Sequence, residues 1–458
     1  MKNDATQKLI RSATTKTLSA KLLAIVTETS DDVRGQAMSA DGARILAAIL
    51  VDETSKRSIT SENAELSAAI MRAMIPLLSS KTTHPVLTML DIGVCEAMCL
   101  ALTAFTKVGK TVKDDVVYDV TLEPAANLIL HPFNYMLTNE MNVEATAAAM
   151  PRYQAIVSER QVMKTIISRL RTSPRDIWPA PIALASRLVM VSPSFAAEFM
   201  ANGGLDATLC RRVLKSRDNA QIVVDWLVTL TQLARMSARN YTIIDDADVT
   251  QIITELLDHP DPNVRARACN TLGNVCRHDA YFYDEFREFK TLEKLIERCS
   301  DSDRTTRKFA AFAIGNAAFH SDALYGPLTA AVDPLVHLLD EQEEPKTRSN
   351  AAAALGNLVR NSNVLCDLMV NSGAMDALIN LIASPNALSE AAGDSQSPLK
   401  IALFSLGNMC THRVCKERLT TRNLEPLLDN LTQYGDETIK KYVTRIKQKI
   451  ERKPARAA

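Results

Sequence analysis

The stretch GNVCRH, residues 273–278, recurs along the chain as GNAAFH at 315–320, GNLVRN at 356–361 and GNMCTH at 407–412. Because the glycines stand at 273, 315, 356 and 407, successive motifs are 42, 41 and 51 residues apart. Periods of about 40 to 47 residues are typical of armadillo and HEAT arrays, in which helical repeats stack on one another. The motif therefore predicts an all-α fold, an armadillo/HEAT-like α-solenoid of stacked helical repeats.

The longest interval between two motifs contains a polar insertion. Residues 383–397 combine Ser, Asp and Gln with Pro and Gly, which is typical of a surface loop. Lengthening a surface loop costs little free energy, so we expect the repeat to tolerate it. We predict three regions: divergent helical, armadillo-like repeats in 1–240, regular armadillo repeats in 241–435 with the inserted loop at 383–397, and a C-terminal capping helix with a basic tail in 436–458.

The first 240 residues show helical periodicity without the Gly-Asn motif. Apolar residues recur at helical spacing in residues 66–80, 95–105 and 222–236. Residues 106–124 instead alternate polar and β-branched residues, and we interpret them as an extended loop rather than a helix.

Composition excludes several classes of protein. The 53 Lys and Arg balance the 53 Asp and Glu, which argues against a protein built mainly to bind nucleic acid, although local patches stay possible. No run of 18 apolar residues is present, and the apolar run at 22–26 is too short for a signal peptide, so we expect no membrane association and a cytoplasmic location. The nine cysteines lie mostly in apolar helical runs and are interpreted as reduced core thiols.

The repeated glycine lies inside a predicted helix. Glycine in a helix interior costs about 1 kcal/mol relative to alanine, so its recurrence implies a compensating contact. We predict that another helix approaches closely at this position.

The motif also predicts a binding surface. The third helix of an armadillo repeat lines a concave groove, and residues four apart lie on one helix face. We predict that the groove holds an extended peptide, with asparagines fixing its backbone and phenylalanines contacting its side chains. The predicted groove residues are Asn270, Asn274, His278, Phe312, Asn316, His320, Asn357, Asn361, Phe404, Asn408 and His412.

A purely structural interpretation of the same residues stays open. The asparagines would then bond backbone groups of neighbouring repeats, and the histidines would cap helix ends. Nuclear-import adaptors of this fold place tryptophan four residues before the asparagine, whereas this chain has Asn270, Phe312, Ala353 and Phe404 there. Nuclear-signal binding is therefore ranked below scaffolding.

The C-terminus offers a second candidate surface. Ile439, Val443, Ile446 and Ile450 follow helical spacing, and basic residues lie largely on the other face. We interpret this segment as a capping helix with a solvated exterior, or as a surface for an acidic partner such as a tubulin tail. The basic residues concerned are Lys440, Lys441, Arg445, Lys447, Lys449, Arg452 and Lys453.

The stretches HPDPNVRARACNTLGNVCRH (259–278), FYDEF (282–286) and SDRTTRKFAAFAIGNAAFHSDALY (302–325) resemble the C-terminal armadillo region of Fused-type serine/threonine kinases. The resemblance covers about residues 250–420. Members of that family act in Hedgehog signalling, in building the central apparatus of motile cilia and, in plants, with a cytokinetic kinesin. The resemblance thus implies a scaffold, and leaves open whether the chain is a kinase-less relative or a piece of a longer protein.

Sequence motifs for catalysis are absent. The chain contains no His-Arg-Asp and no Asp-Phe-Gly, which a protein kinase requires. The VGKT at 108–111 lacks the first glycine of a phosphate loop, because residue 104 is alanine. His278, His320 and His412 recur in repeats about 8 to 10 Å apart, too far to share a metal ion. We expect no enzyme activity, no cofactor and no metal.

These observations predict a non-enzymatic armadillo scaffold. From the resemblance we expect a cytoskeletal location, on the axoneme of a cilium or flagellum, with axonemal or microtubule-associated proteins, a kinesin or a kinase as partners. The alternatives are a cytoplasmic signalling adaptor that docks a kinase or kinesin and, ranked lower, a nuclear transport adaptor. The sequence leaves the oligomeric state open.

Overall fold

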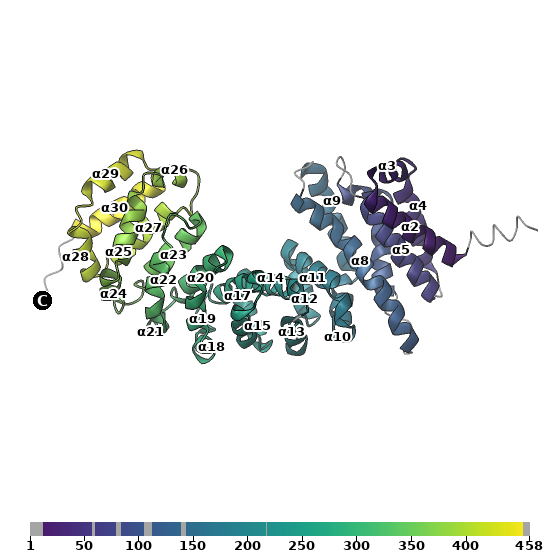
Figure 1. The fold of residues 1–458 in the computed structure, drawn as a ribbon, viewed down its shortest axis with the longest axis horizontal. Helices are drawn as coiled ribbons and strands as arrows, with labels where there is room; N and C mark the ends of the chain where they lie inside the picture. The colour runs from purple at the N-terminus through teal and green to yellow at the C-terminus, as the bar shows by residue number, and fades with distance from the viewer. Residues whose placement is uncertain are drawn as a thin grey trace, which may run out of the picture. The chain divides into compact units, whose positions relative to one another are not determined.

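The computed structural model describes residues 12–56, 60–78, 84–104, 112–138, 143–216 and 218–451. These residues form helices and no strand, which confirms the predicted all-α fold. The chain divides into two compact units, Met1–Leu209 and Cys210–Ala458, and each is described by itself (Figure 1).

Unit 1 is built of helices that differ in length and lack a regular repeat. Helices α2, α5, α8 and α11 pack in succession. Large side chains such as Tyr153, Phe195 and Phe199 are fully buried between the helices of this unit. Its elements are α2 (Ala13–Thr29), α3 (Asp31–Ser39), α4 (Gly42–Ser55), α5 (Ser61–Leu78), α6 (Pro85–Asp91), α7 (Val94–Ala104), α8 (Val112–Thr138), α9 (Val143–Glu159), α10 (Val162–Thr172), η1 (Arg175–Ile177), α11 (Pro179–Val191) and α12 (Pro193–Ala201).

The predicted extended loop at residues 106–124 is wrong from Val112 onward, where α8 begins. Residues 106–111 lie outside the described residues. Thr121 and Leu122 are buried, so tertiary packing outweighs the weak helix propensity of the β-branched residues.

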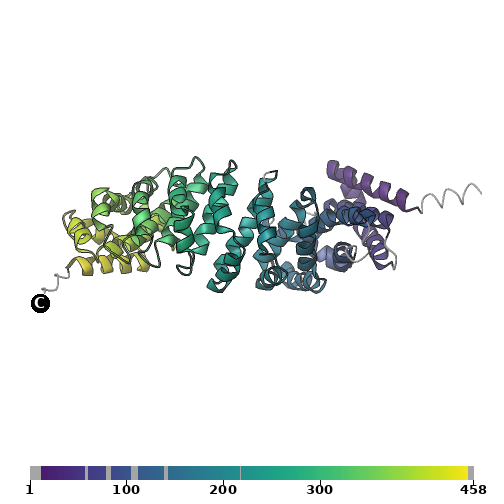
Figure 2. The same ribbon diagram turned by 90° about the horizontal axis from the view of Figure 1, so that it is seen from below.

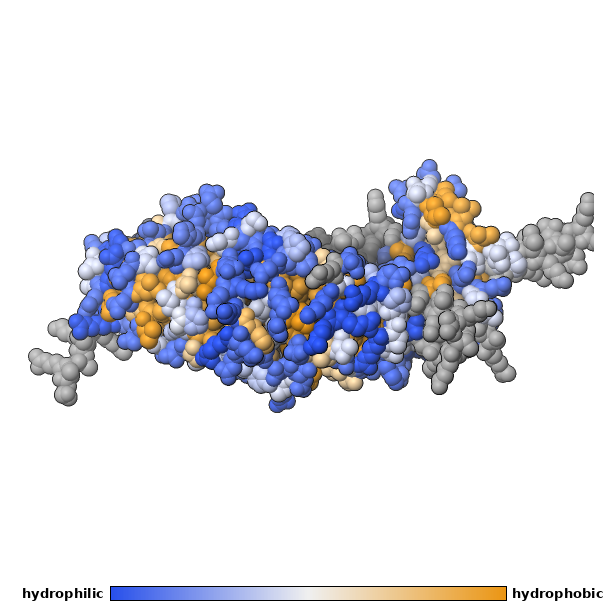
Figure 3. Space-filling model, turned by 60° about the horizontal axis from the view of Figure 1, so that its bottom comes forward, coloured by the Kyte–Doolittle hydropathy of each residue, from blue (hydrophilic) through white to orange (hydrophobic). Residues whose placement is uncertain are grey.

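No single helix among the described residues is long and apolar enough to span a membrane. The bent pair Pro85–Asp91 and Val94–Thr103 reaches that length and apolarity only when both are taken together, with 90° between them. Val86, Met89 and Met98 of this pair are fully buried. Figure 3 shows hydrophobic surface on the N-terminal part of the chain, where Leu18, Leu22 and Ile25 of α2 are about 60% exposed.

Unit 2 consists of regular three-helix repeats. Leu257, Leu295, Leu335 and Leu378 have no exposed surface and form part of the core of the repeats. The first helices are α15 (Tyr241–Asp246), α18 (Tyr283–Glu288), α21 (Tyr325–Leu328), α24 (Cys366–Asn371) and α28 (Arg413–Thr420). The second helices are α16 (Thr250–Glu255), α19 (Thr291–Arg298), α22 (Val332–His337), α25 (Ala374–Ala383) and α29 (Glu425–Tyr434).

The third helices carry the Gly-Asn motif. They are α17 (Pro262–Val275), α20 (Arg304–Ala317), α23 (Pro345–Asn357) and α27 (Pro398–Met409), preceded by α14 (Ala220–Met236) and followed by α30 (Glu437–Glu451). Asp261, Asp303 and Ser397 cap the first turns of three of them by accepting backbone N–H hydrogen bonds. Short connecting helices complete the unit: α13 (Ala207–Leu214), which begins in unit 1, η2 (Ala238–Asn240), η3 (Leu256–Asp258), η4 (Thr329–Ala331) and α26 (Ala387–Ala391).

The insertion at residues 383–397 contains a short helix in addition to loop. Helix α26 packs on α27, and its Ala387 and Ala391 are buried. The Ala391 carbonyl accepts a hydrogen bond from Lys400 of α27 at 3.0 Å. The insertion is thus hydrogen-bonded to α27, the helix that follows it.

Candidate functional site

The third helices of unit 2 pack side by side in chain order. Contacts join α14 to α17, α17 to α20, α20 to α23, α23 to α27 and α27 to α30 (Figures 1 and 2). We call these the ladder helices. The predicted capping helix α30 covers α27 as the last of them.

The predicted close approach at the motif glycine is confirmed at two positions. A Cβ on Gly356 would lie 2.9 Å from the Ser405 Cα, and one on Gly273 would lie 3.0 Å from the Ala313 Cα. At Gly315 the nearest atom, in Ala354, would be 3.5 Å away, which is ordinary contact. A Cβ on Gly407 would likewise meet only the Arg445 side chain, at 3.7 Å.

The motif asparagines link successive ladder helices. The Asn316 amide donates to the Gly273 carbonyl at 2.8 Å, and the Asn357 amide donates to the Gly315 carbonyl at 2.9 Å. Lys449 of α30 stands at the equivalent position and donates to the Gly407 carbonyl at 2.7 Å.

The other two motif asparagines are bonded differently. Asn274 donates to the Asn270 carbonyl within its own helix at 2.8 Å, and Asn408 accepts from the Arg445 guanidinium at 2.9 Å. Both are buried, whereas Asn316 and Asn357 are half-buried. The structural interpretation of the asparagines therefore holds for Asn316 and Asn357, which bond the backbone of the preceding repeat.

The motif histidines also bond to the preceding repeat. Nε2 of His278 lies 3.1 Å from the Arg235 carbonyl oxygen, and Nε2 of His320 lies 3.2 Å from the Arg277 carbonyl oxygen. His412 bonds the Val359 carbonyl in the same way, and Asn361 donates to the Phe319 carbonyl at 3.0 Å. Because a carbonyl only accepts, each of these Nε2 atoms carries a proton. Across the described residues, no three His, Cys, Asp or Glu side chains are placed to hold a metal ion.

A further periodic set, which our sequence analysis missed, consists of Tyr241, Tyr283 and Tyr325 at the start of the first helices. The Tyr241 hydroxyl donates to the Asn274 carbonyl at 2.9 Å and accepts from the His278 backbone N–H at 3.1 Å. Tyr325 makes the same pair of bonds to the next ladder helix. Burial raises the pKa of Tyr241 to about 12, so it stays a neutral donor at physiological pH. The spacing of 42 residues was visible in the sequence.

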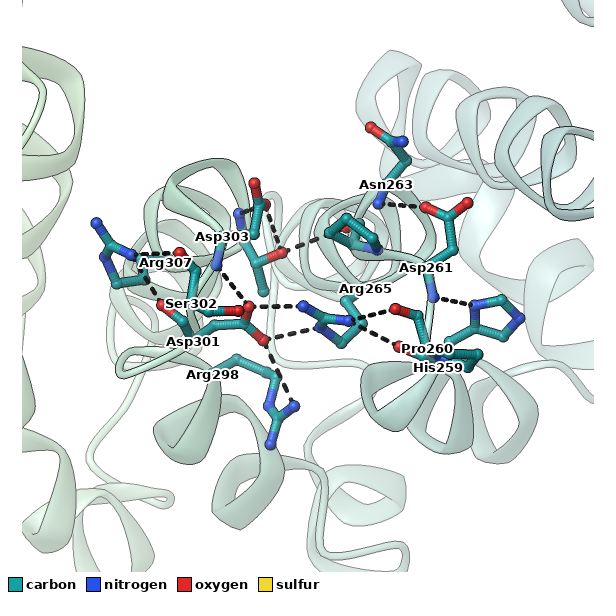
Figure 4. A network of polar contacts seen from close by, with 12 residues as sticks. His259, Pro260, Asp261, Asn263, Arg265, Arg298, Asp301, Ser302, Asp303 and Arg307 are labelled. Atoms are coloured by element: carbon teal, nitrogen blue, oxygen red, sulfur yellow. Dashed lines mark hydrogen bonds and ion pairs between the residues drawn. The ribbon is translucent and has the colours of Figure 1, made fainter.

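Basic residues near the start of the ladder helices form a second missed set (Figure 4). Arg265 donates to both carboxylate oxygens of Asp301 in the next repeat, each at 2.8 Å, and to the carbonyls of His259 and Pro260 in its own loop. Arg307 pairs in the same way with the next repeat, but through one carboxylate oxygen only, Oε1 of Glu343 at 2.7 Å, and donates to the carbonyls of Asp301 and Ser302 in its own loop. We call these contacts the arginine bridges.

Two further pairs toward the C-terminus are counted among the arginine bridges, although the second of them is made by a lysine. Arg348 pairs with Glu390 at 2.9 Å, and Lys400 pairs with Asp436 at 2.7 Å. Burial alone would raise the pKa of the Asp301 carboxyl, but hydrogen bonds from Arg265 and the Asp303 amide hold that pKa below its ordinary value. Each bridge thus joins one repeat to the next through a charged pair.

The outward side of the ladder helices forms one surface, which we call the ladder face. Two of its rows are half-buried throughout, and a third row at the C-terminal ends of the helices is exposed throughout. The first half-buried row is Asp225, Arg267, Phe309, Asn350, Ile401 and Tyr442. The second is Val228, Asn270, Phe312, Ala353, Phe404 and Arg445. The exposed row is Arg235, Arg277, Phe319, Arg360 and Thr411.

The structure therefore brings only part of the predicted groove set together on one face, because Asn274 and Asn408 are buried. Asn270, Phe312 and Phe404 lie in its second row, and the motif asparagines lie one helical turn further along. The exposed row was not predicted, although every member except Arg235 stands three residues after a motif asparagine.

The predicted basic tail divides into two groups. Arg445 and Lys449 point to α27 and belong to the ladder contacts, so they do not form part of a solvated exterior. Lys440 pairs with Glu437 and Lys447 pairs with Asp429, while Lys441 is exposed. Arg452 and Lys453 lie outside the described residues, as does the VGKT stretch at 108–111.

All nine cysteines are buried, which confirms their interpretation as core residues. Burial raises the pKa of Cys410 to about 11 despite the nearby Lys449, and that of Cys95 to about 12. Such thiols are protonated and weakly nucleophilic at neutral pH.

Comparison with known proteins agrees with this architecture. A family model for the Armadillo/beta-catenin-like repeat matches residues 330–360, and a model for the HEAT repeat matches residues 249–279. The chain is 38% identical to serine/threonine-protein kinase TIO of Arabidopsis thaliana over 313 residues, 67% of its length. The chain is related to the Fused-type kinases. Serine/threonine-protein kinase 36 of Mus musculus is a second relative of this type, 28% identical over 252 residues, or 51% of the chain.

The match to these Fused-type relatives is partial on their side. The chain spans 24% of the length of kinase TIO and 18% of the mouse kinase. Among solved structures, an engineered protein superposes with a TM-score of 0.76 over 97% of this chain and 98% of its own, at 17% identity. At that identity the likeness supports the solenoid fold alone.

Proposed function

We propose that this chain is a non-enzymatic scaffold that holds an extended segment of a partner protein on the ladder face. The observation that carries the proposal is the continuity of that face, whose half-buried rows cross all six ladder helices. Such a surface offers apolar contact from Phe309, Phe312 and Phe404 along its length. Extended peptides are bound by this combination of regularly spaced polar groups and side-chain contacts.

The bonding of the asparagines supports this role as well. Asn316 and Asn357 each use one amide hydrogen on a glycine carbonyl. The planar amide is held in one orientation by that bond, and its oxygen and second hydrogen have no other partner among the described residues. An oriented amide of this kind can bond the backbone of a bound peptide.

We further propose that the scaffold works on the axoneme of a cilium or flagellum. This part rests on the resemblance to Fused-type kinases, supported by 38% identity to kinase TIO over two-thirds of the chain. A cytoplasmic signalling adaptor that docks a kinase is the second candidate, because the relatives are themselves named as protein kinases. The ladder face has no tryptophan, since Trp178 and Trp226 are buried, which disfavours a nuclear transport adaptor.

The test combines location with a surface variant. A tagged copy is expressed in a flagellated cell, and its retention on the axoneme after detergent extraction is measured. We expect the unaltered chain to be retained, and Phe319→Glu with Phe404→Glu to be lost into the soluble fraction. Tyr434→Glu is the matched control, because Tyr434 is 65% exposed on α29, away from the ladder face.

The outcomes separate the candidates. If the unaltered chain is soluble or is not enriched in the flagellum, the axonemal proposal fails and the adaptor is favoured. If both variants are retained as well as the unaltered chain, the ladder face is not the binding surface.

A further inference from the structure

Four of the six ladder helices differ in charge from the rest of unit 2. Helices α17, α20, α23 and α27 contain no Asp or Glu. Their charged residues are Arg265, Arg267, Arg304, Arg307, Lys308, Lys346, Arg348 and Lys400. The first and second helices carry acidic residues instead, for example Asp284 and Glu285 in α18 and Glu293 in α19. The formal net charge of zero therefore conceals a separation of charge within each repeat.

Part of this positive charge is already neutralised. Arg265, Arg307, Arg348 and Lys400 form the arginine bridges, and Lys308 pairs with Glu344 at 3.3 Å. The remaining positive charge on the ladder face is carried mainly by arginines without a carboxylate partner among the described residues: Arg235, Arg267, Arg277 and Arg360.

Three arginines of the ladder face lie beside aromatic or polar groups of the same face. The Arg360 guanidinium lies 4.0 Å from the centre of the Phe319 ring, and the Arg445 guanidinium lies 5.2 Å from that of Phe404. Arg235 is held by the Gln232 side chain at 2.6 Å. Stacking on a ring leaves the guanidinium N–H groups at the edge free to donate. Arg235 and Arg360 are therefore oriented but not neutralised.

We propose that the segment bound by the ladder face is acidic, an extended peptide whose carboxylates pair with Arg235, Arg277 and Arg360. This inference rests on the proposed function and adds the chemical class of the partner. Guanidinium groups bind carboxylates through paired hydrogen bonds, which gives geometric specificity as well as attraction. A basic peptide in the same place would instead be repelled by Arg235, Arg277 and Arg360.

The spacing of the exposed row gives the pattern of the peptide. Neighbouring packed helices lie about 8 to 10 Å apart, and an extended chain advances about 3.3 Å per residue. About three peptide residues therefore pass each repeat. Along the exposed row an arginine pair, Arg235 and Arg277, is followed by Phe319 and then by Arg360. We infer two acidic residues, one apolar residue and a third acidic residue, each separated by two others.

A protein segment fits these observations better than a nucleic acid. The exposed row contains an aromatic and a threonine side chain besides its three arginines, so its positive charge is interrupted. Surfaces that bind nucleic acid carry a concentrated positive field. In these repeats the acidic residues of the first and second helices weaken such a field.

The experiment measures binding of the whole chain to a labelled probe peptide by fluorescence anisotropy. The probe is Glu-Ser-Ser-Glu-Ser-Ser-Leu-Ser-Ser-Glu, tested also in reversed order because the chain direction is not fixed. Lys replaces Glu in a control peptide, and a single-stranded oligonucleotide of equal length is the second comparison. We expect one order of the acidic probe to bind, the lysine peptide and the oligonucleotide to bind at least about tenfold more weakly, and affinity to fall as salt is raised.

Paired substitutions locate the site. Arg277→Gln with Arg360→Gln should weaken binding of the acidic probe about fivefold, the sum expected for two exposed ion pairs. Arg211→Gln with Arg287→Gln removes the same charge from exposed arginines that already pair with Asp248 and Asp284, and should leave affinity unchanged. Circular dichroism of both variants checks that the fold is intact.

The results that would overturn the inference are distinct from failure of the scaffold. Equal or tighter binding of the oligonucleotide, or equal loss of affinity in both paired variants, contradicts an acidic peptide on this face. If no acidic probe binds while Phe319→Glu with Phe404→Glu still releases the chain from axonemes, the acidic partner is wrong and the scaffold stands. If the acidic probe binds but axonemal retention is absent, the inference holds and the axonemal location fails.

Discussion

At the scale of single residues, the motif glycines fall into two kinds that the sequence does not separate. Gly273 and Gly356 are required by the close approach of Ala313 and Ser405. Gly315 has room for a methyl group against Ala354. Glycine at the same motif position is therefore required by packing in some repeats and not in others.

This difference gives a matched pair of substitutions. Gly356→Ala should destabilise unit 2 by about 1 to 3 kcal/mol, because the added Cβ displaces the helix that carries Ser405. Gly315→Ala should stabilise it by about 0.5 to 1 kcal/mol, because alanine favours the helix and restricts the unfolded chain. Urea denaturation monitored by circular dichroism measures both. The same sign for the two would contradict the packing argument.

The buried tyrosines allow a second test at this scale. Tyr241→Phe removes the hydroxyl that pairs the Asn274 carbonyl and the His278 N–H, and should cost about 1 to 3 kcal/mol. Tyr281→Phe is the control, since the Tyr281 hydroxyl bonds Asp245 at an exposed site and its loss should cost less than about 1 kcal/mol. Thermal unfolding of both proteins compares them. Equal destabilisation would mean that the periodic tyrosines act only through their rings.

At the scale of elements, each pair of neighbouring repeats is joined at both ends of the ladder helix. The arginine bridge lies near its N-terminal end, and the histidine or Asn361 bond lies beyond its C-terminal end. The helix is thus held at two points, which fixes its orientation against the next helix and keeps the ladder face continuous.

The arginine bridge should be sensitive to loss of one partner. Arg265→Gln leaves the Asp301 carboxylate, only 3% exposed, without its main counter-charge and should cost about 3 kcal/mol at neutral pH. Arg287→Gln, at an exposed pair, should change stability by less than about 1 kcal/mol. Chemical denaturation of the two variants compares them.

The pH dependence of the bridge follows from the lowered pKa of Asp301. The ionised Asp301 carboxylate contributes to the free energy of unfolding. This contribution is fully present above the ordinary pKa of 3.8 and is lost as the pH falls through the lower pKa that Asp301 has in the folded protein. The stability gap between the unaltered chain and Arg265→Gln should therefore narrow below about pH 4. A gap that stays constant to lower pH would show that the arginine stabilises by packing rather than by charge.

The third helices were predicted well from the sequence because their motif is periodic. The prediction failed where contacts between distant residues determine the local structure. Gly273 and its equivalents located the ladder, and the tyrosines at 241, 283 and 325 could have been found at the same spacing. Helix α8 was missed because tertiary packing, seen in the burial of Thr121 and Leu122, outweighs local helix propensity there, and α26 was missed because a five-residue helix has no pattern of its own. The partners of Arg265 and Arg307 lie in the next repeat, so they required the packing of the repeats.

At the scale of the whole molecule, unit 2 combines bonds from glycine carbonyls, histidines, tyrosines and arginine bridges across successive repeats. Stability in repeat arrays is a sum of repeat and interface contributions, and strong interfaces make unfolding cooperative. Unit 2 should therefore unfold as one block.

Hydrogen exchange tests that cooperativity. In Gly356→Ala the protection of amides in α17, α20, α23 and α27 should fall together and by a similar factor. A fall confined to α23 and α27, with α17 unchanged, would show that the repeats unfold one at a time. The conservative substitution Gly315→Ala, expected to raise stability, should raise protection across the same helices.

The acceptors used by Asn316, Asn357, His278 and His320 are all main-chain carbonyls. A joint of this kind depends on the donor side chain of one repeat and on nothing but the peptide group of its predecessor. Whole repeats could therefore be duplicated, deleted or exchanged during evolution, because each repeat carries the donor side chains that bond it to the repeat before it. The number of repeats in such an array can therefore change while the hydrogen bonds between neighbouring repeats stay the same.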